Sequence, residues 1–297
     1  MRFLTWGLSG TIATERDDDL DLASERLWHW VGEVERACSR FRDDSELTTL
    51  NRRAGQTVEV SDVFCLALAA ALRSERLTGG LCDPTILPSL VALGYDTDYD
   101  EVASRPDSPA RQVAPAPGVG AIDFDPVTRT VRLASGTAID LGASAKALVC
   151  DLVADELAAR GGVVVEIGGD VAVRGSGPDG PWAIAVADTL NLTGHEPRVS
   201  VQGGVATSSA TTRTWRSGGA TVNHIVDPRT GRSASGSYAT ATVSAADCVT
   251  ANAFATASLL WDDDAPYHVA QAGWSARLVR RDGGVEYVGG WPEDVVA

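Results

Sequence analysis

The sequence predicts a mixed α/β fold of the α+β type, with an antiparallel sheet packed against several helices in a single domain over residues 1–297. Short β-branched segments separated by Gly- and Pro-rich turns are typical of strands joined as hairpins. They alternate with long stretches whose apolar residues recur at helical spacing. With 44% hydrophobic and 22% charged residues, the chain has ample material for a core. The alternation of hairpins with long helices indicates the mixed fold.

The N-terminal part begins with an expected strand over residues 3–14. Residues 17–19 are acidic and suit the start of a helix, because the N-terminal end of a helix dipole favours negative charge. One face of that helix is apolar and carries Leu20, Leu27, Val31, Val34 and Cys38. Ser45 is expected to cap a short helix, and residues 61–77 predict a further amphipathic helix.

The middle of the chain contains a polar, proline-rich segment over residues 96–120, which we expect to be an irregular connection within the one domain. Residues 121–124 and 130–133 then predict a hairpin.

The stretch from residue 139 to residue 170 is the most informative part of the sequence, because it combines a helix, a strand and two loops that carry aspartates. Its helix shows apolar residues at helical intervals, namely Ala145, Leu148, Val149, Leu152 and Leu157. A Gly-Gly pair ends this helix, and residues 163–167 form a β-branched run that suits a buried strand. The loops at the two ends carry Asp140 and Asp170, and the helix N-terminus offers unpaired N–H groups to an anion. A plain helix packed on a strand is the alternative.

The C-terminal half predicts more strands and one long helix of small residues. The expected elements are a hairpin of 171–174 with 182–187, a pair of 199–202 with 204–207, strands 221–226 and 238–244, the helix 248–261, and the closing strands 276–280 and 285–288.

The charge and cysteine content exclude several classes of function. A net charge of −15 disfavours nucleic-acid binding, which needs clustered Lys and Arg, and gives no help in binding anionic lipids. Five scattered cysteines without C-x-x-C spacing indicate reduced thiols, not disulfides or a zinc site. The first residues lack the apolar core of a signal peptide, and no segment is apolar enough to span a membrane. We therefore expect a cytoplasmic protein.

A set of motifs in one order along nearly the whole chain resembles the ApbE family, the FAD:protein FMN transferases. The segments are SGT at 9–11, CSRFRDDSELTTLN at 38–51, GGLCDPTILPSL at 79–90, IDLGASAKA at 139–147, GGD at 168–170, VATSS at 205–209, HIVDPRTG at 224–231 and ANAFATA at 251–257. Each segment is weak evidence alone, whereas their order is specific. The resemblance implies a single ApbE-like (T-fold-like) domain.

The resemblance also implies a reaction. A threonine or serine hydroxyl of a partner flavoprotein attacks the pyrophosphate of FAD, AMP leaves, and FMN stays attached through a phosphoester, with Mg²⁺ as activator. Such a reaction needs charge neutralisation on the pyrophosphate, a base for the hydroxyl and a grip on the flavin ring.

By resemblance, the flavin lies against Phe41 and the turn containing Leu81, Cys82 and Asp83, although Asp83 before a proline is also an ordinary turn residue. Cys82 replaces a large apolar residue of the family. The other residues that the resemblance assigns to FAD are Ser9, Asp140, Lys146, Asp170, Thr207, Ser208 and Ile225.

Several of these assignments have a plain structural alternative. Asp140 could cap the following helix, and Lys146 could pair with a nearby carboxylate. Asp170 could be a turn residue, and Thr207 and Ser208 could end a strand whose backbone passes the ligand.

The general base is expected to be His224, at a strand end before Ile225, in the motif that the family uses at the reacting phosphate. His29 and His268 lie within expected helices and are expected to be structural, and His195 is in a polar loop.

The Mg²⁺ site that the resemblance implies consists of the main-chain carbonyl of Ala143 and the side chains of Asn252 and Thr256, which are four residues apart on one helix face. Asn252 stands where the family has an aspartate, so the site lacks an anionic ligand that Mg²⁺ favours. Asn252 could instead tie its helix to the sheet.

The sequence is compatible with three functions: the transferase, an FAD-binding protein without transferase activity, and an FAD hydrolase that gives FMN and AMP. The oligomeric state and the acceptor protein are not predicted.

Overall fold

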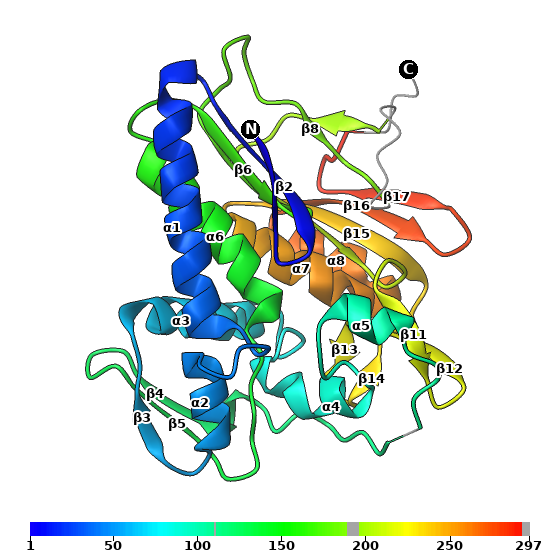
Figure 1. The fold of residues 1–297 in the computed structure, drawn as a ribbon. Coiled ribbons are helices and arrows are strands. Elements are labelled where there is room, and N and C mark those ends of the chain that lie inside the picture. The colour runs from blue at the N-terminus through cyan, green and yellow to red at the C-terminus, as the bar shows by residue number, and fades with distance from the viewer. Residues whose placement is uncertain (110, 189–195, 293–297) are drawn as a thin grey trace. The chain divides into compact units, whose positions relative to one another are not determined.

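The computed structural model describes residues 1–109, 111–188 and 196–292, and the chain divides into two compact units (Figure 1). Unit 1 comprises Met1–Gly32, Lys146–Thr212 and Gly236–Ala297, and unit 2 comprises Glu33–Ala145 and Arg213–Ser235. Two of the four boundaries fall inside helices, α1 (Leu20–Cys38) and α6 (Gly142–Leu157), and the other two lie between strands.

Unit 1 is built on an eight-stranded sheet whose neighbouring strands all pair antiparallel. In sheet order the strands are β1 (Arg2–Thr5), β2 (Leu8–Thr14), β6 (Val163–Ile167), β7 (Asp170–Arg174), β10 (Gly203–Ser209), β15 (Tyr238–Ala245), β16 (Ser275–Arg280) and β17 (Val285–Val288). The predicted mixed fold with an antiparallel sheet is confirmed.

The prediction of one strand over residues 3–14 is wrong, because β1 and β2 form a hairpin there. Trp6 and Gly7 both have positive φ, 51° and 70°, as a two-residue hairpin turn requires. Glycine suits such a conformation, whereas a tryptophan there gives no turn signal in the sequence.

The helix α7 (Cys248–Trp261) packs on β10 and β15, and its bounds are as predicted. Four of its buried residues are alanines, at positions 251, 253, 255 and 257, whose small side chains allow close packing. At Gly204 an added Cβ would lie 2.3 Å from the Cys248 nitrogen, so β10 accepts only glycine there. A short helix, α8 (Ala265–Gln271), follows α7.

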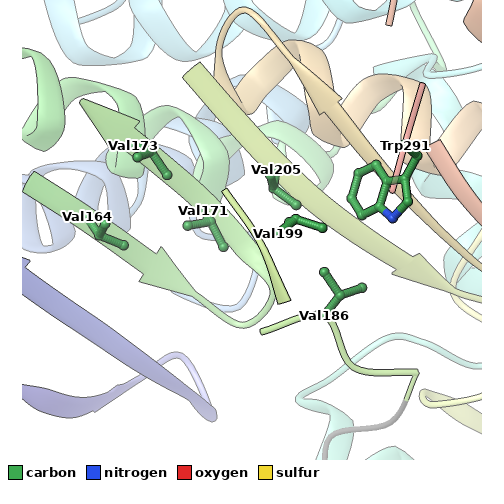
Figure 2. Close-up of a cluster of buried hydrophobic side chains, with 7 residues drawn as sticks. All are labelled: Val164, Val171, Val173, Val186, Val199, Val205 and Trp291. Carbon is green, nitrogen blue, oxygen red and sulfur yellow. The ribbon is translucent and has the colours of Figure 1, made fainter. Parts of the chain in front are cut away.

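An apolar cluster covers part of the sheet (Figure 2). It consists of Val164, Val171, Val173, Val186, Val199, Val205 and Trp291. Val199 belongs to, and Val186 directly follows a strand of, the small hairpin of β8 (Ile184–Ala185) and β9 (Arg198–Val199). Two predicted pairings are therefore wrong: β7 pairs with β6 and β10, not with residues 182–187, and residue 199 pairs with β8, not with 204–207.

Unit 2 contains short helices, a three-stranded sheet in the order β3-β5-β4 and two hairpins, β11–β12 and β13–β14. Its helices are α2 (Glu46–Arg52), α3 (Asp62–Leu77), α4 (Leu87–Ala92) and α5 (Tyr99–Ser104). Its strands are β3 (Thr57–Glu59), β4 (Ile122–Asp125), β5 (Thr130–Leu133), β11 (Thr214–Ser217), β12 (Ala220–Asn223), β13 (Val226–Asp227) and β14 (Arg232–Ser233). Single 3-10 turns occur at Asp17–Asp19, Pro84–Ile86, Val119–Ala121 and Asp262–Asp264.

The predicted cap at Ser45 is confirmed, since its hydroxyl accepts from Thr48 N. Ser61, expected as the first residue of a helix, caps α3 instead, with its hydroxyl accepting from Phe64 N. The segment 96–120 is only partly irregular, because α5 forms inside it and buries Val102. The strand expected over 221–226 is also interrupted, because residues 224 and 225 separate β12 from β13.

The core of unit 2 that matters for the site consists of Leu90, Leu93, Tyr95, Val102, Trp215 and Val226. It joins α4 and α5 to the hairpins β11–β12 and β13–β14. Across the described residues, no helix has the length and apolar character to cross a membrane.

Candidate functional site

In unit 2, the guanidinium of Arg40 lies between two aromatic rings. Its central carbon is 4.0 Å from the ring centre of Phe41 and 4.4 Å from that of Tyr95. Arg40 Nε lies 3.1 Å from Asp140 Oδ2, and Arg40 Nη1 donates to the Tyr95 carbonyl at 2.8 Å. The Arg40 side chain is only 9% exposed, whereas Phe41 is 43% exposed. The motifs that contain Phe41 and Asp140 therefore meet at one buried cation.

The loop before α6 is fixed by two further contacts. The Asn51 side chain donates to the Ile139 carbonyl at 2.9 Å and accepts from Ile139 N at 2.8 Å. Asp140 Oδ1 accepts from Gly142 N at 2.6 Å, so the alternative role of Asp140 as a cap at the start of α6 is observed. The Asp140 main-chain N–H donates to the Pro84 carbonyl at 2.8 Å, which brings a third motif to this loop.

The Asp83 carboxylate caps the 3-10 turn Pro84–Ile86. Its Oδ1 accepts from the N–H and from the hydroxyl of Thr85, each at 2.7 Å. Asp83 and Leu81 are buried, and Cys82 is half-buried. The turn therefore offers mainly its main chain and the half-buried Cys82 to a ligand.

His224 is half-buried and lies between β12 and β13. The side chain of Asn223 holds the segment that contains this histidine: it accepts from Ile225 N at 3.0 Å, directly after His224, and donates to the Ala234 carbonyl at 2.9 Å, after β14. Ser233 Oγ donates to the Asn223 carbonyl at 2.8 Å. Ile225 itself is buried. The main chain around His224 is thus held rigidly, which suits a group that must be aimed at a substrate.

In unit 1, three of the predicted residues form one polar cluster. The Asp170 side chain is 3% exposed; its Oδ1 accepts from Asn252 Nδ2 at 2.8 Å, and its Oδ2 lies 3.3 Å from Lys146 Nζ. Both alternative roles considered for Lys146 and Asn252, as an ion-pair partner and as a tie between helix and sheet, are observed. One ammonium thus balances one carboxylate, with the amide beside them.

Thr207 and Ser208 point to opposite faces of the sheet, because side chains alternate along a strand. Ser208 Oγ lies 3.0 Å from Thr256 Oγ1 on α7, whereas Thr207 Oγ1 lies 2.9 Å from Thr242 Oγ1 on β15. Asp170 is the cross-strand partner of Ala206, so it shares the α7 face with Ser208. Only the Ser208 side chain therefore joins the cluster around Asp170.

The turn between β6 and β7 is held on both sides. Gly168 N donates to the Ser9 carbonyl at 3.0 Å, and Thr207 N donates to the Gly169 carbonyl at 3.1 Å. Both glycines have positive φ, 60° and 92°, which this turn requires. The main chains of Ser9 and Thr207 are thus brought beside the turn that precedes Asp170.

A second carboxylate on the opposite sheet face belongs to Glu166, which accepts from Gly169 N at 3.1 Å. Burial raises the pKa of Glu166, and the N–H of Gly169 and the hydroxyl of Thr11 act against that rise.

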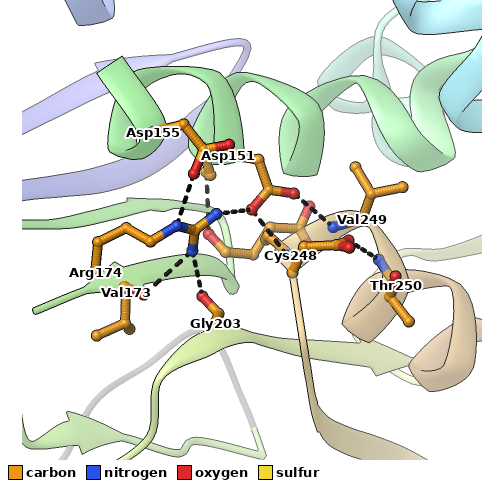
Figure 3. A network of polar contacts seen from close by, with 11 residues as sticks. Asp151, Asp155, Val173, Arg174, Gly203, Cys248, Val249 and Thr250 are labelled. Atoms are coloured by element: carbon orange, nitrogen blue, oxygen red, sulfur yellow. Dashed lines mark hydrogen bonds and ion pairs between the residues drawn. The ribbon is translucent and has the colours of Figure 1, made fainter. Parts of the chain in front are cut away.

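The start of α7 is held by two carboxylates (Figure 3). Asp151 accepts from Cys248 N at 2.9 Å and from Val249 N at 3.0 Å, and Asp247 accepts from Thr250 N at 2.7 Å. These bonds satisfy three N–H groups that a helix N-terminus leaves without intrahelical partners. Burial raises the pKa of Asp151, while the two N–H groups and Arg174 act against that rise.

Arg174 completes this network. It lies 3.1 Å from Asp151 and 2.7 Å from Asp155, and donates to the carbonyls of Val173 and Gly203 (Figure 3). The network connects α6, which carries Lys146, to α7, which carries Asn252 and Thr256.

The donors near Asp170 suit a hard cation in chemical type, since the side chains of Asn252, Thr256 and Ser208 all offer oxygen. The nitrogen of the Asn252 amide, not its oxygen, is the atom that donates to Asp170. Ala143 lies in the exposed first turn of α6. Within the described ranges, no group of three or more His, Cys, Asp or Glu side chains is arranged to hold a metal. Within unit 1, the side chains of Asn252, Thr256 and Ser208 fit Mg²⁺ only as a weak site that relies on the charge of the ligand.

The sequence pattern missed four residues that this geometry makes prominent: Arg40, Tyr95, Asn223 and Asp151. Asn223 had a signal, since Asn is favoured where a side chain bonds the main chain two residues on. Arg40 and Tyr95 meet only through folding. Of the other histidines, His29 packs edge-on against Trp30 and His268 stacks on Trp261, while His195 lies outside the described residues.

The profile of the ApbE family matches residues 7–277. This chain belongs to the ApbE family. The FAD:protein FMN transferase of Treponema pallidum is 30% identical over 264 residues, which cover 80% of this chain and 71% of the relative. That of Vibrio cholerae is 28% identical over 273 residues, covering 89% and 77%. The relative from Rhodobacter capsulatus is 33% identical, and the match spans 47% of its length.

Solved ApbE structures have the same fold. The ApbE protein of Thermotoga maritima matches with a TM-score of 0.81 at 24% identity, covering 97% of this chain and 96% of the other. The flavinyl transferase ApbE of Pseudomonas stutzeri, in its apo form, matches with a TM-score of 0.80 at 22% identity, covering 97% and 93%.

Proposed function

We propose that this protein is a Mg²⁺-dependent FAD:protein FMN transferase, which moves FMN from FAD to a threonine or serine hydroxyl of a partner flavoprotein and releases AMP. The observation that carries the proposal is the ApbE family match over residues 7–277. Every motif segment, from residue 9 to residue 257, falls within that range. The curated relatives bear this enzyme name.

In the proposed reaction, the acceptor oxygen forms a bond to the phosphorus of the FMN half of FAD. The bond from that phosphorus to the bridging oxygen breaks, and its electron pair leaves with AMP. The hydroxyl proton passes to a base. FAD and the acceptor thus give the FMN phosphoester and AMP without any redox change. Catalysis of such a transfer rests on positioning and on charge stabilisation.

His224 takes the role of general base in this proposal. It is half-buried; the Asn223 side chain holds Ile225 N after it, and Ser233 Oγ holds the Asn223 carbonyl before it. A base on a rigid segment can be kept within hydrogen-bond reach of the hydroxyl.

The flavin grip is assigned to unit 2. Phe41 offers an exposed aromatic surface beside Arg40, on which a planar ring can stack. The turn of Leu81, Cys82 and Asp83 adds main-chain groups, and Ile225 adds an apolar contact.

The phosphate-binding role is assigned to Lys146 and Ser208, with Asp170 holding the ammonium in place. Asn252, Thr256 and the carbonyl of Ala143 would hold Mg²⁺, which would supply positive charge to the pyrophosphate. Ser9 and Thr207 contribute their main chains next to the turn before Asp170.

A second function, an FAD-binding protein without transferase activity, is favoured by one observation. The carboxylate of Asp170 is already balanced by Lys146, and the neutral Asn252 stands where the family has an aspartate. A site that is balanced without a cation has less need of Mg²⁺. FAD hydrolysis, with water in place of the hydroxyl, is a third possible outcome.

One experiment separates these functions. The protein is incubated with FAD and Mg²⁺, with and without a folded candidate acceptor domain that exposes threonines. AMP is measured by chromatography and covalent FMN by mass spectrometry. The transferase predicts AMP and acceptor-bound FMN in equal amounts. Acceptor-independent AMP with free FMN would indicate the hydrolase, and saturable FAD binding without AMP would indicate the binding protein.

The base is tested by His224→Ala, with His29→Ala as the matched control. General-base removal lowers rates by about 10²–10⁴-fold. We expect such a fall in kcat for AMP release with FAD affinity nearly unchanged, because the base acts on the hydroxyl. Parent-like rates in His224→Ala would remove this residue from the mechanism.

A further inference from the structure

Arg40 occupies a position in unit 2 that none of the motif roles explains. Its guanidinium contacts Phe41 and Tyr95 on their ring faces and also binds the Asp140 carboxylate and the Tyr95 carbonyl. With this many partners and a side chain that is only 9% exposed, Arg40 has a fixed position in the folded protein and is not a solvated surface charge.

The contact with Asp140 changes the charge of the loop before α6. Asp140 is nearly buried, and an unpaired carboxylate there would repel the phosphates of a nucleotide. The Arg40 guanidinium at 3.1 Å supplies the compensating charge. Asp140 can therefore cap Gly142 as an anion without leaving a net negative charge at the loop.

The contact with Phe41 decides which ring face a ligand can use. Arg40 lies over one face at 4.0 Å, while the residue as a whole remains 43% exposed. The cation–π contact also keeps the ring in one orientation. A planar ligand can then stack only on the opposite face of the Phe41 ring, whose orientation Arg40 fixes.

The contact with Tyr95 links Arg40 to the apolar core of unit 2 that includes a residue close to His224 in sequence. The Tyr95 ring lies 5.2 Å from that of Trp215, and both belong to the core that includes Val226, two residues after His224. Arg40 thus joins the motif of Phe41, the loop of Asp140 and the core that contains Val226 within one unit.

We propose that Arg40 is a positioning residue, which orients Phe41 for stacking on the isoalloxazine ring and neutralises Asp140 beside it. The inference rests on the proposed function. Lysine cannot replace it fully, because an ammonium lacks the planar face and the forked donors with which Arg40 contacts two rings, a carboxylate and a carbonyl.

The test compares the two halves of the nucleotide. FMN and ADP binding are measured by titration calorimetry for the parent, Arg40→Met, Arg40→Lys and the control Arg42→Met. Arg42 is two residues away, has a 40% exposed side chain, and is paired with Asp44 and Glu35. A lost cation–π contact with a freed ring corresponds to about tenfold in affinity. We expect FMN affinity to fall about tenfold in Arg40→Met and less in Arg40→Lys. ADP affinity should fall less than FMN affinity in Arg40→Met, which leaves Asp140 without its cation, and stay unchanged in Arg40→Lys, which retains the positive charge.

A kinetic split gives the second readout. KM for FAD should rise with FMN affinity, while kcat for AMP release at saturating FAD stays within about threefold, because ring stacking is retained in ground and transition states alike. A merely structural role would lower the melting temperature without separating FMN from ADP.

The outcomes are distinguishable. Parent-like FMN binding by Arg40→Met, or equal losses for FMN and ADP in folded Arg40→Lys, overturns the role of Arg40 alone. A parent protein that binds neither FAD nor FMN overturns the proposed function, and this inference with it.

Discussion

The carboxylate of Asp151 offers a test of how firmly α7 is held, because its two oxygens accept from Cys248 N and Val249 N inside the protein. Asp151→Ala leaves both buried N–H groups without acceptors, at a cost of about 1–3 kcal/mol each. Arg174, 19% exposed, keeps Asp155 and two carbonyl partners, so its loss of Asp151 adds little.

Part of that cost is recovered in the variant. The raised pKa of Asp151 indicates that burial of its carboxylate is itself unfavourable, and the alanine variant no longer buries that charge. We therefore expect the free energy of unfolding of unit 1 to fall by about 2–4 kcal/mol. Urea denaturation followed by circular dichroism measures the loss, and amide hydrogen exchange at residues 248 and 249 should accelerate.

The matched control is Asp155→Ala. Asp155 contacts the same arginine but is 64% exposed, so its removal should cost less than about 1 kcal/mol. Equal losses for the two variants, or a loss below about 1 kcal/mol for Asp151→Ala, would refute the reasoning.

Two more substitutions test the charges around the turn between β6 and β7. Asn252→Asp puts a second carboxylate beside Asp170, so in the absence of Mg²⁺ it should destabilise the protein by about 1–3 kcal/mol at an effective dielectric near 20. Added Mg²⁺ should restore the melting temperature of this variant more than that of the parent; the same deficit with and without Mg²⁺ would assign Asn252 to the scaffold. The raised pKa of Glu166 means that the folded protein keeps this proton to higher pH than the unfolded chain, so stability falls as pH rises from the ordinary value of 4.5 through the folded pKa. Glu166→Gln, which retains an acceptor for Gly169 N, should therefore be more stable than the parent at about pH 8, with the gain vanishing below about pH 4; urea midpoints at both pH values check this, and a gain independent of pH would contradict it.

Local signals in the sequence predicted the helices well. Ser45 and Ser61 cap the helices that follow them, and α7 has its predicted bounds. Such features depend on residues a few positions apart, so they can be predicted from the local sequence. Strand pairing cannot be predicted in this way, because β10 pairs with β7 and β15 across long stretches of chain. Pairing strands by their adjacency in sequence therefore gave the wrong partners.

The site shows the same division. The motif residues Asp140, Lys146 and Asp170 could be named from the sequence, whereas their partners could not. Arg40 reaches Asp140 from a position a hundred residues earlier in the chain, and Asp151 meets α7 almost as far away in the other direction. The opposite orientations of neighbouring strand residues, as at Thr207, also become known only once β10 has a face and a partner.

The paired charges at Asp140 and Asp170 have a consequence for how an anionic nucleotide meets this acidic protein. With a net charge of −15, the chain repels a dinucleotide at long range. That field fades over about 8 Å at physiological ionic strength. Within this distance the ligand meets carboxylates already matched by Arg40 and Lys146. The encounter rate should therefore rise with added salt, whereas the dissociation rate should be set by the local pairs.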